Sequence, residues 1–329
     1  KPTDIYLKEV RAETERIEYR TPIKFGGRIV TDVTLFNVTV VAETRDGRRG
    51  EGFGSMPMGN VWAWPSHVAS AEQTLAAMIE LSHRLAKLGD EYTGCGHPLE
   101  IVHELSTNYA SDANDAVAAT GVQEAMPRLA QLVCASPLDA AIHDAFGKTL
   151  GANSYNLLGE QFVNADLAVY LNDEFSGEYL DAYTSREPQP AMPLYHLVGA
   201  LDPLFDEDIE QPVNDGLPES LGEWIIADRL THLKIKLNGD NLDWDVERVA
   251  GVEAASAAAQ QSRGCSTWHY SLDFNEKCES VEYILEFLAK LRERSPAALD
   301  RVQYIEQPTH RDLKSHPQNK MHEAAKIKP

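Results

Sequence analysis

The segment HLKIKL, residues 232–237, alternates between polar and apolar side chains. A period of two is typical of a β-strand and places Lys234 and Lys236 on one face of it. Further short strands, with helical periodicity between them, predict parallel βα units and an α/β fold. Strands are expected at Ala165–Leu171, His232–Leu237, His269–Phe274 and Val302–Glu306, and helices at 219–230, 243–262, 279–294 and 318–325.

Lys234 and Lys236 have two interpretations. Two ammonium groups on one inward face are costly, so a solvated edge strand explains the pattern without any function. In the alternative, each cation makes the other easier to deprotonate, which lowers a lysine pKa towards the range of a general base.

Polar groups also lie at the ends of the next two strands. Asp273 and Asn275 share a face, and Glu306 ends a strand two residues before Pro308. Each has an ordinary explanation, because Asx residues end strands and a lone Glu is usually solvated. However, the carboxyl ends of parallel strands carry the ligand sites of α/β folds. Two carboxylates there supply the oxygen ligands that Mg²⁺ prefers.

The first part of the chain has a different organisation. Val33–Glu43 is rich in β-branched residues and precedes the turn dipeptide Asp46-Gly47, which predicts a hairpin. Residues 21–27 and 55–65 are predicted to be mobile loops. Helices are expected from Ser66 to Gly89 and at 98–107, 113–125 and 136–150, the last capped by Ser136-Pro137. The first 150 residues therefore predict an α+β unit.

Residues 172–218 interrupt this alternation. They contain six prolines and many acidic residues, and they are far longer than an ordinary βα connection. We expect an insertion or lid there.

Taken together, these motifs resemble the mandelate racemase and muconate-lactonizing branch of the enolase superfamily. The residues that carry the resemblance are Lys234 and Lys236, Asp273 and Asn275, and the IEQP of residues 305–308, in the family's order. Residues 136–159 are similar to the helix that leads into the family's barrel. The resemblance implies an α+β capping domain at 1–135. It also implies the N-terminal part of a TIM-type (β/α) barrel at 136–329, with the insertion at about 172–218.

The resemblance also implies roles for these residues. Asp273 and Glu306 would be two of three carboxylate ligands for one Mg²⁺, and Lys236 would be the base for the proton α to a substrate carboxylate. Lys234 would neutralise that carboxylate and tune Lys236. Asn275, together with Lys24 and Trp62 from the capping domain, is expected to lie near the substrate.

The spacing also implies that the pattern continues. Asp273 follows Lys236 by 37 residues and Glu306 follows Asp273 by 33. A third ligand is therefore expected at or beyond Pro329. Four strands make half of an eight-stranded barrel. The sequence is accordingly expected to be part of a longer polypeptide or to need a second chain.

Composition restricts the class of protein. The chain has 329 residues, 43% of them hydrophobic, and a formal net charge of −21, which disfavours nucleic acid and anionic membranes as partners. Its four cysteines have no CxxC spacing, so free thiols and a cytoplasmic location are expected.

The predicted function is Mg²⁺-dependent removal of an α-proton through an enediolate, in a racemase, epimerase, dehydratase or cycloisomerase. The substrate is expected to be a small carboxylate, such as a hydroxy or sugar acid, and the protein to be a homo-oligomer. The alternative is a non-catalytic metal-binding barrel that acts as a binding or scaffold protein. A sugar-isomerase barrel is disfavoured because it would predict His ligands.

Overall fold

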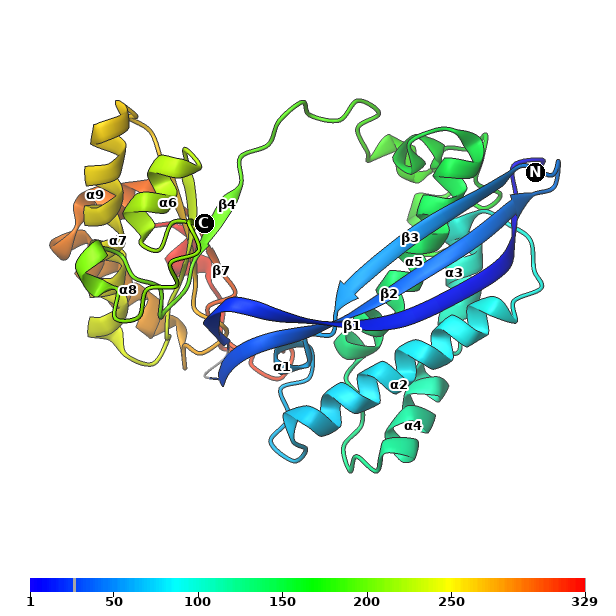
Figure 1. Cartoon of the computed structure of the whole chain (residues 1–329), viewed down its shortest axis with the longest axis horizontal. Helices are drawn as coiled ribbons and strands as arrows, with labels where there is room; N and C mark the ends of the chain where they lie inside the picture. Colours follow the sequence, from blue (N-terminus) through cyan, green and yellow to red (C-terminus); the bar gives the residue numbers. More distant parts are fainter. Residues whose placement is uncertain (26–27, 329) are drawn as a thin grey trace. The chain divides into compact units, whose positions relative to one another are not determined.

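The computed structural model describes residues 1–25 and 28–328, which form two compact units (Figure 1). The first unit contains Lys1–Arg20 and Thr31–Gln189, and the second contains Thr21–Val30 and Pro190–Pro329. Each unit has its own hydrophobic core.

A three-stranded sheet forms one layer of the first unit. Its strands are β1 (Ile5–Phe25), β2 (Arg28–Thr44) and β3 (Arg49–Pro57), in that order. β2 and β3 are antiparallel, and their turn contains Gly47 with φ +87°, so the predicted Asp46-Gly47 hairpin is confirmed.

The two predicted loops are largely ordered elements. Residues 21–25 belong to β1, and residues 55–57 belong to β3. Residues 60–63 form the short helix α1 (Asn60–Ala63). The mobile-loop prediction is wrong for these parts, and Gly26 and Gly27 lie outside the described residues.

Helix α5 (Arg128–Leu150) packs against strand β3 of this sheet. Three further helices pack against α5: α2 (Ala71–Asp90), α3 (Pro98–Ser106) and α4 (Tyr109–Thr120). Helix α2 begins with a capping box, in which Ser70 and Gln73 exchange side-chain and backbone hydrogen bonds. All four predicted helices exist, although α4 begins four residues before its predicted start.

Helix α5 is longer than the sequence predicted, because Pro137 lies inside it rather than at its start. A proline has no N–H for the carbonyl four residues earlier, here Val133. The Ser136 hydroxyl donates to that carbonyl oxygen at 3.0 Å, so the helix continues through the proline. The predicted domain boundary between residues 135 and 136 falls within α5 and stays a prediction. The compact units divide at Gln189/Pro190.

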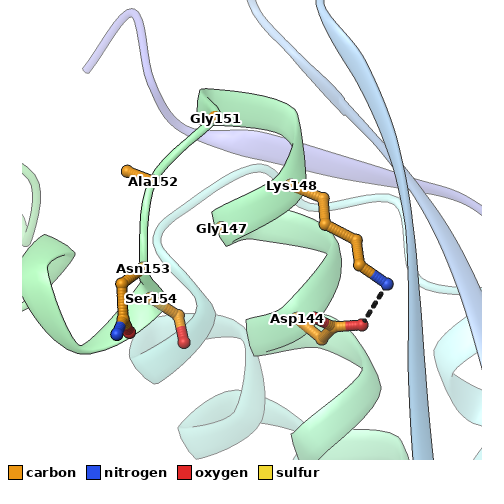
Figure 2. Close-up of a pocket in the computed structure, with 7 residues that line it drawn as sticks. All are labelled: Asp144, Gly147, Lys148, Gly151, Ala152, Asn153 and Ser154. Carbon is orange, nitrogen blue, oxygen red and sulfur yellow. Dashed lines mark ion pairs between the residues drawn. The ribbon is translucent and has the colours of Figure 1, made fainter. Parts of the chain in front are cut away.

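A polar hollow of about 530 Å³ lies at the C-terminal end of α5 (Figure 2). Asp144 in its wall accepts from Lys148 Nζ at 2.7 Å and from the Phe53 N–H at 2.8 Å. The helix ends at Gly151, which has φ +64°. Asp144 therefore pairs with Lys148 within α5 and also links this helix to strand β3 through Phe53.

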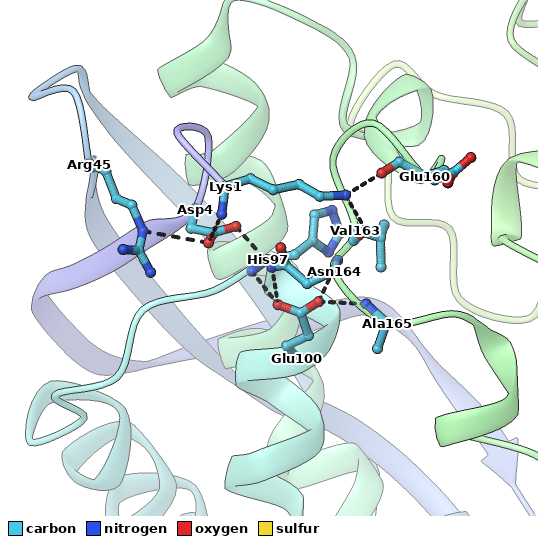
Figure 3. Close-up of polar contacts among 9 residues, drawn as sticks. All are labelled: Lys1, Asp4, Arg45, His97, Glu100, Glu160, Val163, Asn164 and Ala165. Atoms are coloured by element: carbon cyan, nitrogen blue, oxygen red, sulfur yellow. Dashed lines mark hydrogen bonds and ion pairs between the residues drawn. The ribbon is translucent and has the colours of Figure 1, made fainter.

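Glu100 on α3 anchors the segment that follows α5 (Figure 3). Its carboxylate accepts hydrogen bonds from the backbone N–H groups of Asn164, at 2.7 Å, and Ala165, at 3.2 Å. The same carboxylate accepts from the side chain of Asn164 at 2.7 Å and from the His97 N–H at 3.0 Å. One carboxylate therefore fixes both the start of α3 and residues 164–165.

His97 is buried beside this carboxylate and is neutral. Its Nε2 lies 2.9 Å from the Leu157 carbonyl oxygen, and its Nδ1 accepts from the Leu99 N–H at 3.1 Å. Burial lowers the pKa of His97 to about 4. Each of these contacts suits a single neutral tautomer, so protonation is unfavourable in the folded state.

We therefore expect acid to destabilise the first unit through His97. Between pH 6.5 and 4 the unfolded chain binds a proton at this position and the folded chain does not, so stability falls as the pH falls. The full effect is about 3 kcal/mol at pH 4 and below. Urea unfolding at several pH values measures it. His97→Asn keeps a capping acceptor and should flatten the slope, whereas an unchanged slope would contradict the assignment.

Short 3₁₀ helices follow α5. They are η1 (Ser154–Leu157), η2 (Leu167–Val169), η3 (Asp173–Phe175) and η4 (Leu180–Ala182). The predicted strand at Ala165–Leu171 is wrong, because Asp166 caps η2 through the Ala168 N–H, at 3.1 Å. Prediction of 172–218 as one insertion is also wrong, since strand β4 (Tyr195–Val198) lies inside it.

The second unit contains a four-stranded parallel sheet. Its strands are β4, β5 (His232–Lys236), β6 (His269–Asp273) and β7 (Val302–Glu306), side by side in chain order. Its helical segments are η5 (Asp206–Asp208), α6 (Leu221–Ala227), α7 (Leu242–Arg263), α8 (Val281–Arg294), α9 (Pro296–Arg301) and α10 (His322–Ala325). Apolar strand residues such as Ile235 and Leu272 are fully buried in the core with Val249 and Phe287 from the helices. The α/β fold class is thus confirmed.

Two further observations concern the whole described chain. Across residues 1–25 and 28–328, none of the helices is both long and apolar enough to cross a membrane. All four cysteines are free.

Candidate active site

Charged side chains from three adjacent strands meet at one end of the parallel sheet. The strand register aligns Lys236 on β5 with Asp273 on β6, and Asp273 with Glu306 on β7. Lys234 precedes Lys236 by two residues and therefore lies on the same face. The structure brings together all four charged residues that the sequence singled out.

The four charges are joined through shared oxygens. Lys234 Nζ lies 2.5 Å from Glu306 Oε2 and 3.2 Å from Asp273 Oδ2. Lys236 Nζ forms an ion pair with the same Asp273 oxygen. We call Lys234, Lys236, Asp273 and Glu306 the charged quartet. Two cations and two anions balance, so the quartet is neutral inside a strongly acidic chain.

Two members of the charged quartet are buried. Lys236 and Asp273 are each only 5% exposed. Burial by itself raises the pKa of Asp273, but the hydrogen bond and charge of Lys236 outweigh it and bring that pKa below its usual value. Asp273 is consequently held as a carboxylate.

Lys234 differs from the prediction that neighbouring lysines lower each other's pKa. Burial does lower the pKa of Lys234, but the hydrogen bonds and charges of Glu306 and Asp273 raise it more. The net pKa of Lys234 lies above its usual value, so that prediction is wrong for this residue. The sequence pattern identified the two cations but did not show that each would face a carboxylate.

Asn275 belongs to the same site. Its Oδ1 lies 3.2 Å from Lys236 Nζ, its Nδ2 donates to the Leu237 carbonyl oxygen at 3.2 Å, and its N–H donates to Asp273 Oδ1 at 2.9 Å. The backbone of Asn275 is left-handed, with φ 53°. This turn brings the amide back over the strand ends, where it holds Lys236 from a second side.

The loops after β6 and β7 share this unusual backbone. Glu276 and Gln307 have φ values of 64° and 37°. The Glu276 N–H donates to the Gln307 carbonyl oxygen at 3.1 Å, and the Glu276 carboxylate pairs with Arg311 at 2.7 Å. Left-handed non-glycine residues are costly and cluster at functional sites. Here they follow the strand ends that carry Asp273 and Glu306.

Lys24 is brought to the second unit's loops. Its Nζ donates to Asn238 Oδ1 at 2.9 Å, and both residues lie in that unit. They line a pocket of about 60 Å³. The pocket is formed by Lys24, Ala200, Leu237, Asn238, Asp240, Asn275 and Lys277. Sequence reasoning missed Asn238, although its position two residues after Lys236 could have indicated it.

Trp62 lies elsewhere. It is on α1 in the first unit, where it is half-buried against that unit's core. Its expected place near the substrate stays a prediction.

The donor atoms suit a hard cation. A carboxylate oxygen of Asp273 on β6 and one of Glu306 on β7 both contact the ammonium group of Lys234. Within residues 1–25 and 28–328, no group of three or more His, Cys, Asp or Glu side chains is placed to hold a metal. Two protein carboxylates with other oxygen ligands are nevertheless the usual environment of Mg²⁺.

No family model and no curated protein matches this chain. Among solved structures it is similar to the L-Ala-D/L-Glu epimerase from Bacillus subtilis, with TM-score 0.57 and 13% identity, over 93% of this chain and 62% of that one. It is also similar to an enolase from Bradyrhizobium, solved with magnesium and mandelic acid, with TM-score 0.54 and 16% identity over 95% and 64%.

A third similar structure is a mandelate racemase/muconate lactonizing protein from Herpetosiphon aurantiacus, with TM-score 0.50 and 16% identity over 94% and 63%. The chain thus spans less than two thirds of the length of these structures. At such identities the likeness concerns the fold. The chain shares the fold of these structures over the part that it spans.

Proposed function

We propose that this protein is a magnesium-dependent enzyme of the racemase or epimerase type, which removes the α-proton of a carboxylate substrate. The observation that carries the proposal is the charged quartet at the ends of three adjacent parallel strands. The fold shared with an epimerase and with a mandelate-bound enolase supports it.

Lys236 is the proposed base. It is buried, and Asp273 and Asn275 hold its Nζ from two sides, so its position is fixed before a substrate arrives. A lysine accepts a proton only as the neutral amine, so Lys236 has to give up its ion pair with Asp273 first. Lys234 would then neutralise the substrate carboxylate, since it is the more exposed of the two cations.

Asp273 and Glu306 are the proposed magnesium ligands. When bound, the metal would stabilise the negative charge that builds on the substrate carboxylate as the α-proton leaves. Their oxygens converge on the Lys234 ammonium and thus already surround a cation. Asp273 and Glu306 would hold the metal, and Lys234 would contact the substrate carboxylate.

The architecture supports the same proposal. We propose that the β4–β7 sheet is part of a (β/α) barrel, since its strands lie in chain order. The expected places of Lys24 and Trp62 near the substrate remain predictions. A hydroxy or sugar acid as the substrate, the cytoplasmic location and the homo-oligomeric state remain predictions.

Lys236→Ala tests the proposal. The wild type is incubated in D₂O with Mg²⁺ and a panel of carboxylates that includes mandelate and L-Ala-L-Glu, and exchange of the α-proton is followed by NMR. We expect the variant to lose exchange by a factor of about 10² to 10⁴, the usual contribution of a general base. Calorimetry should show that Mg²⁺ still binds.

Lys290→Ala is the matched control. Lys290 is an exposed lysine on α8 that pairs with Asp243 at 2.9 Å, so its removal should leave exchange unchanged. Undiminished exchange in Lys236→Ala would remove Lys236 as the base.

One observation favours the alternative of a non-catalytic binding or scaffold protein. Both lysines are ion-paired, and the carboxylates raise the pKa of Lys234. Such a protein would bind Mg²⁺ and a carboxylate but exchange no α-proton anywhere in the panel.

A further inference from the structure

Asp245 is a buried carboxylate that the proposed chemistry does not use. It lies in the first turns of α7 and is fully buried. It accepts from the Asn238 N–H at 2.7 Å, the Gly239 N–H at 2.9 Å and the Tyr283 hydroxyl at 2.6 Å. Among the described residues it has no cationic partner. A buried charge without a counterion is expensive unless hydrogen bonds satisfy it, and here three do.

Two of these donors show which segment of the chain Asp245 holds in place. Asn238 and Gly239 form the loop directly after β5, the strand that carries both lysines. Gly239 has φ +76°, and a Cβ there would lie 3.0 Å from the Phe274 carbonyl oxygen. The loop is therefore tightly bent and packed. Asp245 accepts hydrogen bonds from the N–H groups of both Asn238 and Gly239.

Two further hydrogen bonds connect this loop to Lys236, the proposed base. The Leu237 carbonyl oxygen, next to Asn238, accepts from Asn275 Nδ2 at 3.2 Å. Asn275 Oδ1 in turn lies 3.2 Å from Lys236 Nζ. On the other side, Asn238 Oδ1 accepts from Lys24.

We infer that Asp245 is a positioning residue that fixes the loop after β5. Through Leu237 and Asn275, this loop in turn fixes the location of the Lys236 ammonium group. Tyr283, from the next βα unit, holds the carboxylate in the required rotamer. The hydrogen bonds alone support the inference that Asp245 fixes the loop. Its effect on Lys236 as a base rests on the proposed function.

Asp245→Asn is the variant that tests this inference. The amide keeps one acceptor oxygen, but its NH₂ group faces a backbone donor. We expect the amide protons of Asn238 and Gly239 to exchange with solvent at least about tenfold faster, as for the loss of a charge-assisted hydrogen bond. In the α-proton assay, kcat should fall about tenfold and KM much less, because the base rather than substrate binding is displaced.

Glu253→Gln is the matched control. Glu253 is a second buried carboxylate on α7, and it accepts from the Tyr270 hydroxyl at 2.6 Å near the start of β6. Its loss should lower stability but leave loop exchange and kcat unchanged. If Glu253→Gln reproduces the effects of Asp245→Asn, the role of Asp245 is only structural.

Tyr283→Phe keeps the test decisive if Asp245→Asn fails to fold. It removes one donor and keeps the carboxylate, so a smaller change in the same direction is expected. Unchanged amide exchange at Asn238 and Gly239 in the folded variants overturns the inference. If no carboxylate in the panel exchanges even with the wild type, the proposed function fails, and amide exchange alone decides whether Asp245 fixes the loop.

Discussion

Asp273→Asn is expected to destabilise the second unit by about 3 kcal/mol, the cost of breaking a buried ion pair from one side. Asp273 Oδ2 is the shared partner of Lys234 and Lys236. The neutral amide removes the ion pair of Lys236, which is only 5% exposed. Urea unfolding at pH 7, followed by the fluorescence of the tryptophans, measures the loss.

Asp243→Asn provides the comparison for that variant. Asp243 is an exposed acid on α7 whose partner is Lys290. Surface pairs of this kind contribute about 0–1 kcal/mol. Equal losses in the two variants would show that the charged quartet is not a buried, mutually dependent unit.

Gly52→Ala is expected to destabilise the first unit by at least about 3 kcal/mol, the upper range for overpacking a core. A Cβ at Gly52 would lie 2.1 Å from the Ala145 nitrogen and 2.3 Å from the Ala141 carbonyl oxygen, both in the backbone of α5. A helix backbone cannot yield as a flexible side chain can, so β3 and α5 must separate. The midpoint of urea unfolding measures the effect.

Glu51→Ala in the same strand is the control for Gly52→Ala. Glu51 is exposed and pairs with Arg11 at 2.8 Å, so its removal should change stability by less than about 1 kcal/mol. A Gly52→Ala protein as stable as the wild type would mean that α5 does not approach β3 as closely as described.

The sequence was informative where local pattern and tertiary structure agree. Strand β7 begins and ends at its predicted residues, and Lys234, Lys236, Asp273 and Glu306 meet as strand geometry requires. The period of two and the parallel arrangement are sufficient for that result.

The sequence failed where a single contact decides. Strand β4 is four residues long and lies among prolines, so periodicity does not reveal it. The apolar run at Ala165–Leu171 looks like a strand until Asp166 caps a 3₁₀ turn. Pro137 looks like a helix start until the Ser136 hydroxyl satisfies the Val133 carbonyl. The role of Asp245 likewise depends on side-chain direction rather than on spacing.

The shared position of Lys234 between two carboxylates makes the binding of opposite charges interdependent. Lys234 is the counterion of both Asp273 and Glu306. If an anion drew its ammonium group away, the affinity of the two carboxylates for a metal cation would rise. A cation that displaces the ammonium equally releases it for an anion. Thermodynamic linkage requires the two enhancements to be equal, so substrate and metal would bind cooperatively at this sheet edge without any change of fold.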